Sequence, residues 1–272
     1  MSSKALIDIC IIPAAGKGSR WAPVSGYLPK EMLPLVDKPV IEWVINEAIA
    51  AGCKKIIVII NPHKKVIKKY LQGLREIQKK AEIEFVSQDE PLGIAHALLL
   101  TKNIIQQNPF FVALPDLPTL SKKMVLAQLG KAFEVVNGEA NIVSFGSFPP
   151  FTQHLYSECL TQMRTDGLLD IIHFCPKDVV NKSAHHPGNK LRMSGRYIFV
   201  PEIFSAIEKL ADSRIEGEIK DTDALKAAIE DGLKVVGVSI NGHTYDTGNP
   251  ENYVRANTAF FKKQFAKAVK VF

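Results

Sequence analysis

The sequence predicts an α/β fold: a Rossmann-like, mostly parallel sheet flanked by helices, forming a single domain over residues 1–272. Short apolar runs rich in β-branched residues alternate along the chain with segments whose apolar residues recur at helical spacing. The composition, 46% hydrophobic and 23% charged, is that of a globular domain with a sizeable core. Because consecutive predicted strands are joined through helices, right-handed crossovers should make them parallel.

The alternation is clearest in the first half of the chain. Strands are predicted at residues 6–12, 56–60, 83–87, 110–114 and 141–147. Helices are predicted between them at residues 40–51, 64–80, 93–105 and 122–136. The helix at 40–51 has the clearest limits, since Pro39 stands near its first turn and Gly52 just past its end.

The pattern loosens between about residues 148 and 200. Prolines interrupt this segment at positions 149, 150, 176 and 187, and short strands are predicted at 168–174 and 191–200. We expect an insertion over approximately 148–200 that covers one side of the sheet within the single domain. Helices at 201–210 and 221–231, a strand at 233–240 and a helix at 250–268 are predicted after it.

Composition and charge argue against membrane and nucleic-acid functions. No apolar run reaches the roughly 18 residues of a membrane span, and Asp8 and Pro13 interrupt the apolar stretch near the start. The net charge of +6 arises largely from lysines between residues 64 and 80, spaced as on a solvated helix face. We therefore expect a cytoplasmic protein without membrane or nucleic-acid partners.

No C-x-x-C pair occurs, and we expect buried free thiols at Cys10, Cys53, Cys159 and Cys175.

Ligands of such sheets bind beyond the carboxyl ends of the strands, so the loops at 13–30, 88–93 and 115–118 are the candidate sites. The first loop begins Pro-Ala-Ala-Gly-Lys-Gly-Ser-Arg, from Pro13 to Arg20. Its small residues let the backbone approach an anion closely, and its N–H groups can hold phosphate oxygens. Lys17 is followed by Gly18 rather than Ser or Thr, which excludes a Walker A loop, and no third glycine completes a dinucleotide fingerprint.

The segment Leu-Pro-Lys-Glu-Met-Leu-Pro follows at residues 28–34. The combination of A-A-G-x-G-[ST]-R with P-K-E-M-L-P resembles the signature of the sugar-phosphate nucleotidyltransferase family, and in particular of bacterial UTP–glucose-1-phosphate uridylyltransferases. The resemblance runs from about residue 7 to 260 in the family's order. Further matches are Leu-Pro-Asp at 114–116, Ser-Gly-Arg-Tyr at 194–197, Gly-Glu-Ile-Lys-Asp-Thr-Asp at 217–223 and Tyr-Asp-Thr-Gly-Asn at 245–249.

The resemblance implies transfer of a nucleotidyl group from UTP to glucose 1-phosphate, giving UDP-glucose and pyrophosphate. Such a reaction depends mainly on positioning and on neutralising phosphate charge. By resemblance, Arg20 would hold the β- and γ-phosphates and Lys30 would lie beside the α-phosphate. The implied Mg²⁺ ligands are Asp116 and Asp246, because Mg²⁺ prefers carboxylate and phosphate oxygens. The implied nucleotide-binding residues are Ala14, Ala15, Gly16, Gly18, Gln88 and Gly93, with Gln88 reading the base through its amide.

The sugar-phosphate end of the site matches less closely. The implied contacts are Gly195, Glu218 and Lys177, and the segment 148–200 would be the sugar-binding insertion. The family usually has Glu-Lys-Pro on a strand of this insertion, where the Glu binds sugar hydroxyls and the Lys binds the sugar's phosphate. This chain has Phe-Cys-Pro at 174–176 and no Glu between residues 159 and 201.

Several alternatives stay open. The spacing Q-x-x-P-x-G-[IL]-A from Gln88 is closer to glucose-1-phosphate thymidylyltransferases, which would use dTTP, and another sugar is also open. A catalytically weakened nucleotide-binding regulatory homologue is supported by the Phe-Cys replacement. A metal-dependent glycosyltransferase is disfavoured because Asp116 is not part of a D-x-D motif. We expect a homo-oligomer, an ordinary helical role for His96 and a helix-capping role for Asp223.

Overall fold

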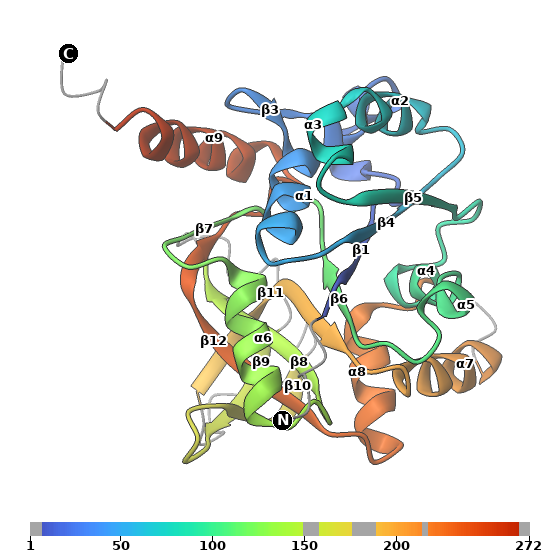
Figure 1. The fold of residues 1–272 in the computed structure, drawn as a ribbon, viewed down its shortest axis with the longest axis vertical. Helices are drawn as coiled ribbons and strands as arrows, with labels where there is room; N and C mark the ends of the chain where they lie inside the picture. The colour runs from blue at the N-terminus through green and yellow to red at the C-terminus, as the bar shows by residue number, and fades with distance from the viewer. Residues whose placement is uncertain (1–6, 149–157, 176–188, 214–216, 267–272) are drawn as a thin grey trace.

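The computed structural model describes residues 7–148, 158–175, 189–213 and 217–266, and it has an α/β fold built on one large sheet (Figure 1). Four parallel strands form its first half. β1 (Ile9–Pro13) lies between β4 (Lys55–Ile60) and β6 (Phe110–Ala113), and β5 (Glu82–Ser87) pairs with the outer side of β4. All four strands agree with the sequence-based predictions to within three residues at either end.

The second half of the sheet is mixed. β11 (Asn189–Phe199) runs antiparallel to β6 and to β8 (Asn141–Ser147), and β8 is parallel to β12 (Val235–Thr244). The antiparallel strands β10 (Leu169–Cys175) and β9 (Glu158–Met163) continue the sheet, and β7 (Thr119–Ser121) pairs with the end of β12. The strand order is β5-β4-β1-β6-β11-β8-β12-β10-β9.

The expectation of a mostly parallel sheet therefore holds for β5, β4, β1 and β6, whereas the strand pairs in the rest of the sheet are antiparallel except for β8 with β12. One physical reason is the connection: β9 pairs antiparallel with both β10 and β11, and no helix in the described residues separates these three strands along the chain. β11 enters the middle of the sheet, between β6 and β8. The limits of the segment 148–200 as an insertion stay a prediction.

Successive side chains of β1 point into two apolar layers, because side chains alternate along a strand. Cys10 and Ile12 belong to one layer, and Ile9 and Ile11 to the other. The first layer is covered by α1 (Val40–Ala50), α2 (Lys65–Gly73), α3 (Arg75–Gln78) and α6 (Val125–Val135). The second is covered by α4 (Ile94–Leu99), α5 (Lys102–Ile105), α7 (Ile203–Ser213) and α8 (Asp221–Glu230). The sheet is thus buried on both faces, as its continuous apolar strands predict.

A smaller apolar cluster fixes the last helix. Leu33 and Leu35 pack with Ala256 and Phe260 of α9 (Pro250–Gln264), beside the two-stranded ribbon of β2 (Pro34–Leu35) and β3 (Lys38–Pro39). Figure 1 shows α9, in red, at the edge of the molecule near β3. This packing attaches α9 to the segment that contains the predicted catalytic residue Lys30.

Three details differ from the sequence-based predictions. The helix expected at 93–105 is divided into α4 and α5, where the Thr101 hydroxyl donates to the Leu98 carbonyl at 2.7 Å. The lysine-rich helix is divided in the same way into α2 and α3. The strands β7 and β9 were missed because one has three residues and the other is largely polar.

Cys10, Cys53 and Cys159 are buried free thiols as expected. No helix in the described residues is long and apolar enough to cross a membrane.

A buried ion pair connects the first helix layer with the sheet. Arg196 on β11 is fully buried, and its Nε and Nη2 donate to Glu47 Oε2 of α1 at 3.1 and 2.9 Å. Its Nη1 donates to the carbonyl oxygens of Leu114 and Gly195, both at 3.1 Å. The guanidinium therefore fixes the backbone at the carboxyl end of β6 through the Leu114 carbonyl.

Replacing Arg196 by Met should lower the free energy of unfolding by about 3–5 kcal/mol, because Glu47 and two buried carbonyl oxygens would lose their donor. Denaturant unfolding of the purified variant measures this. The matched control is Arg164→Met, which removes an exposed pair with Asp166 at 2.8 Å and should cost no more than about 1 kcal/mol. Equal effects of the two substitutions would contradict a structural role for the buried pair.

Candidate active site

The three loops that follow parallel strands line one pocket of about 390 Å³. The loop after β1 contributes Ala15, Gly16, Arg20 and Lys30. Other lining residues come from the loops after β5, β6 and β12, from β11, and from the segment before α8: Gln88, Gly93, Asp116, Gly195, Glu218 and Asp246 among them. The prediction that ligands bind beyond the carboxyl ends of these strands therefore has a cavity of suitable size at that place.

The predicted phosphate loop divides into residues that face the pocket and residues that support it. Ala15 and Gly16 line the pocket, and a side chain on Gly16 would meet no protein atom within 4 Å. Ala14 does not line it, since its N–H continues the sheet by donating to the Ile59 carbonyl at 2.7 Å. Gly18 does not line it either; it has φ 68° and starts the short turn of residues 19–21. Close backbone approach to an anion is thus open at Ala15 and Gly16.

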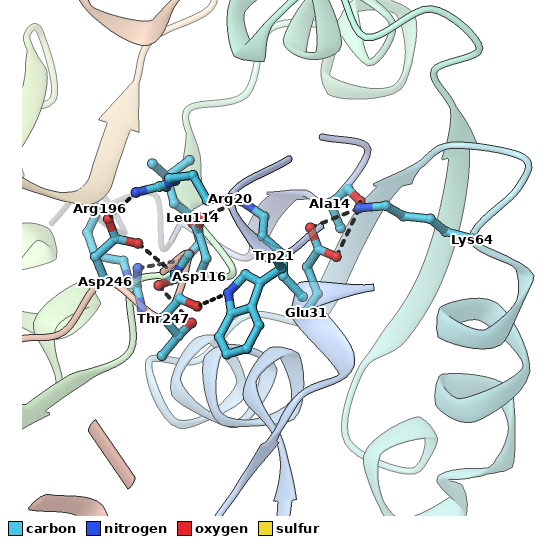
Figure 2. A network of polar contacts seen from close by, with 12 residues as sticks. Ala14, Arg20, Trp21, Glu31, Lys64, Leu114, Asp116, Arg196, Asp246 and Thr247 are labelled. Atoms are coloured by element: carbon cyan, nitrogen blue, oxygen red, sulfur yellow. Dashed lines mark hydrogen bonds and ion pairs between the residues drawn. The ribbon is translucent and has the colours of Figure 1, made fainter. Parts of the chain in front are cut away.

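Two ion pairs lie among the residues that line the pocket, and Figure 2 shows the one between Arg20 and Asp246. Arg20 Nη1 lies 3.0 Å from Asp246 Oδ2, and Lys30 Nζ lies 2.5 Å from Asp116 Oδ2. Each predicted catalytic cation is therefore paired with a predicted metal ligand. Asp246 is 4% exposed, whereas about half of the Arg20 side chain is exposed. Arg20 therefore lies where a solvent-borne anion could reach it.

Gly248 lies where these groups converge. A Cβ atom at Gly248 would lie 2.5 Å from Arg20 Nη2, 2.6 Å from Asp246 Oδ1 and 3.1 Å from Asp116 Oδ2. The two carboxylates thus approach a common point that only glycine leaves open. Carboxylate pairs of this kind suit Mg²⁺, which completes its coordination with phosphate and water oxygens. Among the residues that the structure describes, no larger group of metal-binding side chains gathers.

Backbone contacts hold the two aspartate loops together. Thr247 donates to the Asp116 carbonyl twice, from its N–H at 2.9 Å and from its hydroxyl at 3.0 Å. Trp21 Nε1 donates to the Thr247 carbonyl at 2.9 Å, which attaches the phosphate loop to the same place (Figure 2). The relative positions of Arg20, Asp116 and Asp246 are therefore set by contacts outside the pocket.

Lys30 and Asp116 each stabilise the charged form of the other. Burial alone would lower the pKa of Lys30, but the carboxylates of Asp116 and Glu31 outweigh it and the pKa is raised. Burial alone would raise the pKa of Asp116, yet the ammonium of Lys30 and the guanidinium of Arg20 bring it below its usual value. Both groups are charged at neutral pH, which suits a site for a metal and polyphosphate.

A third ion pair supports the site, and its lysine was predicted only to lie on a solvated helix face. Lys64 Nζ donates to both Glu31 carboxylate oxygens, at 3.0 and 2.9 Å, and to the Ala14 carbonyl at 2.9 Å (Figure 2). The Glu31 side chain is 1% exposed. Lys64 thereby joins the phosphate loop to the residue next to Lys30. Lys64 directly precedes α2, and the spacing of the lysines in this segment does not indicate that Lys64 turns inward.

Gln88, which lines the pocket, is 3% exposed, and its amide nitrogen lies 3.1 Å from the Gly93 carbonyl oxygen and 3.0 Å from His96 Nδ1. Gly93 has φ 101°, and a Cβ there would collide with backbone atoms of Ile219. Ile219 also exchanges backbone hydrogen bonds with Leu92 and Ala95, at 2.8 and 3.1 Å. This close contact joins the loop after β5 to the 217–223 segment.

Gly195 and Glu218 also line the pocket, together with Met193, Tyr197, Lys220 and Asp221. The Tyr197 hydroxyl donates to Asp221 Oδ2 at 2.5 Å. Asp223 accepts from the Lys220 N–H at 3.1 Å, so it caps α8 from the third helical position rather than preceding the helix. Phe174, at the place of the family's usual Glu, is buried in the apolar core and does not line the pocket. Lys177 lies outside the described residues.

The fold and this site agree with the comparisons to known proteins. Residues 9–263 match the family model described as nucleotidyl transferase, and the chain belongs to that family. A UTP–glucose-1-phosphate uridylyltransferase of Pseudomonas aeruginosa is 30% identical over 281 residues, covering 96% of this chain and 98% of that protein. The same-named protein of Bacillus subtilis is 30% identical, covering 92% of this chain and 89% of that protein.

Comparison with solved structures leads to the same family. A UDP-glucose pyrophosphorylase in complex with UDP-glucose superposes with a TM-score of 0.82 at 30% identity, over 94% of this chain and 99% of that one. A glucose-1-phosphate thymidylyltransferase from Bacillus anthracis has a TM-score of 0.73 at 21% identity, over 92% of this chain, and shares the fold. The fold class and the family predicted from the sequence are thereby confirmed.

Replacing Gly248 by Ala should lower nucleotidyl-transfer activity about 10- to 100-fold, because the methyl group would displace Arg20 and Asp246, and small displacements of catalytic groups have effects of this size. Steady-state assays with saturating substrates measure the loss. The control is Gly130→Ala in α6, where an added Cβ meets no atom within 4 Å. If Gly248→Ala has wild-type activity, the close approach of Arg20, Asp116 and Asp246 at Gly248 is not required for catalysis.

Proposed function

We propose that this protein transfers the uridylyl group of UTP to glucose 1-phosphate, giving UDP-glucose and pyrophosphate. The observation that supports this best is the arrangement of two cations, Arg20 and Lys30, and two carboxylates, Asp116 and Asp246, around Gly248 in one pocket. Relatives named for this reaction cover nearly the whole chain. We expect the enzyme to act in the cytoplasm as a homo-oligomer.

In the proposed reaction, a phosphate oxygen of the sugar 1-phosphate attacks the α-phosphorus of the triphosphate in line, and pyrophosphate leaves. Lys30 would neutralise charge at the α-phosphate, and Arg20 would hold the β- and γ-phosphates. The N–H groups of Ala15 and Gly16 would approach the phosphates from the loop. Asp116 and Asp246 would hold Mg²⁺, which would neutralise phosphate charge when bound.

Two groups of pocket-lining residues have different roles in this proposal. Gln88 and Gly93 would bind the base, while Gly195 and Glu218 would contact the sugar. The burial of Phe174 favours a second candidate, a related sugar 1-phosphate, because the carboxylate usual at that place is missing. A silent regulatory homologue is less well supported, since both cations and both carboxylates of the reaction are present and paired.

A pyrophosphate-release assay tests the proposal. UTP, dTTP and CTP are each combined with glucose 1-phosphate and with its epimers, and the nucleotide sugar is identified by mass. We expect the highest kcat/KM for UTP with glucose 1-phosphate. Higher kcat/KM with dTTP or another sugar phosphate would reassign the substrate within the class, and no release with any pair would remove the proposed activity.

Lys30→Ala should lower kcat about 100-fold or more while the protein stays folded, because the charge that Lys30 neutralises develops mainly in the transition state. Steady-state kinetics with saturating UTP give the change in kcat, and circular dichroism checks the fold. Lys54→Ala, at an exposed position away from the pocket, is the control. A wild-type kcat for Lys30→Ala would remove Lys30 from the mechanism.

Asp116→Asn and Asp246→Asn should each raise the Mg²⁺ concentration that gives half-maximal activity by about 10-fold or more, because each substitution removes one anionic ligand oxygen. Mg²⁺ titrations of the variants and the wild type measure this. Full wild-type activity in excess chelator would exclude the two-carboxylate metal site.

A further inference from the structure

We infer that His96 is a positioning residue for base recognition: it fixes the Gln88 amide so that only the carbonyl oxygen is presented to the nucleotide. The inference rests on the proposed function, in which Gln88 contacts the base. It changes the sequence-based picture in two respects. His96 has a partner, and Gln88 reads the base with one acceptor rather than with a donor and an acceptor together.

The orientation of the Gln88 amide follows from its two neighbours. The Gly93 carbonyl oxygen can only accept a hydrogen bond, so the amide atom 3.1 Å from it must be the NH₂ group. The same nitrogen lies 3.0 Å from His96 Nδ1. Because an amide NH₂ has no acceptor capacity, His96 Nδ1 must accept, and the neutral ring bears its proton on Nε2.

Both hydrogens of the Gln88 amide are therefore used inside the protein. Within the described residues, Gln88 Oε1 makes no hydrogen bond, and Gln88 lines the pocket. Its backbone is fixed as well, since its N–H donates to the Ile60 carbonyl at 2.9 Å and its carbonyl accepts from Asn61 Nδ2 at 3.3 Å. The amide thus has one fixed orientation, with its acceptor left for a ligand.

With its orientation fixed, Gln88 Oε1 distinguishes pyrimidine bases by whether their N3 atom bears a hydrogen. Uracil and thymine have an N3–H that can donate to Gln88 Oε1, whereas N3 of cytosine is an acceptor and would face it with lone pairs opposed. A site with one unpaired polar group rejects a base that cannot pair with it. The geometry therefore favours UTP and dTTP over CTP, and it does not separate uracil from thymine.

Without His96 Nδ1, one of the two hydrogen bonds that orient the amide disappears, and the amide can turn to meet either kind of base edge. One net hydrogen bond corresponds to about 3- to 10-fold in an equilibrium constant. His96→Leu should therefore lower the ratio of UTP to CTP affinity by about 3- to 10-fold, mainly through weaker UTP binding. It should leave kcat with saturating UTP near the wild-type value, since His96 touches no reacting group.

The experiment is calorimetric titration of the wild type, His96→Leu and His96→Asn with UTP and with CTP, alongside steady-state kcat and KM. The Asn oxygen can take the place of Nδ1 as an acceptor, so His96→Asn should recover most of the wild-type ratio. His63→Leu, at an exposed position, is the histidine-matched control and should keep that ratio. If His96→Leu does not fold, as judged by thermal unfolding, His96→Ala is measured with the same expectations.

Two results would overturn the inference, and they are distinguishable. If the wild type prefers UTP and a folded His96→Leu or His96→Ala keeps the full preference, His96 does not position the reader, while the proposed function is unaffected. If the wild type itself binds UTP and CTP equally, Gln88 does not read the base, and the base assignment in the proposed function fails together with this inference.

Discussion

The pairing of two cations with two carboxylates at the ends of the parallel strands is the interaction on which the rest of the structure depends. Arg20 and Asp246 are 226 residues apart in the sequence, and Lys30 and Asp116 are 86 apart. Four charged groups, arranged as two pairs of opposite sign, can share so small a space only if the backbone around them is rigid. Gly248 leaves room for Arg20, Asp116 and Asp246, since a Cβ atom there would lie 2.5–3.1 Å from these side chains.

Contacts outside the pocket supply the rigidity. Lys64 holds the phosphate loop and Glu31 from the first helix layer, and Arg196 holds the end of β6 from within the sheet. Thr247 joins the two aspartate loops through the Asp116 carbonyl. The charged groups of the pocket are therefore preorganised, so little reorganisation is required when phosphate charge develops, and that is the main source of catalysis in such sites.

The sequence predicted the parallel half of the sheet, its helices and ten of the residues that line the pocket, because buried parallel strands have apolar runs and because loops at their carboxyl ends meet. It gave no indication of contacts that depend on tertiary structure. Ala14 belongs to the predicted phosphate loop, and its N–H continues the sheet. Lys64 directly precedes a lysine-rich helix, and only the fold turns it inward. His96 has no sequence partner at helical spacing, since its partner Gln88 lies in the preceding loop. Antiparallel pairing of β11 likewise depends on connections that local patterns do not define.

The most direct measurement of the central claim is a crystal structure with UTP and Mg²⁺ bound. We expect the triphosphate in the described pocket, with the metal on Asp116 and Asp246, and with Lys30 and Arg20 in contact with phosphate oxygens instead of those carboxylates. The backbone around Gly248 should keep its conformation. A triphosphate bound elsewhere, or bound with both ion pairs intact and no metal on the two aspartates, would contradict the account.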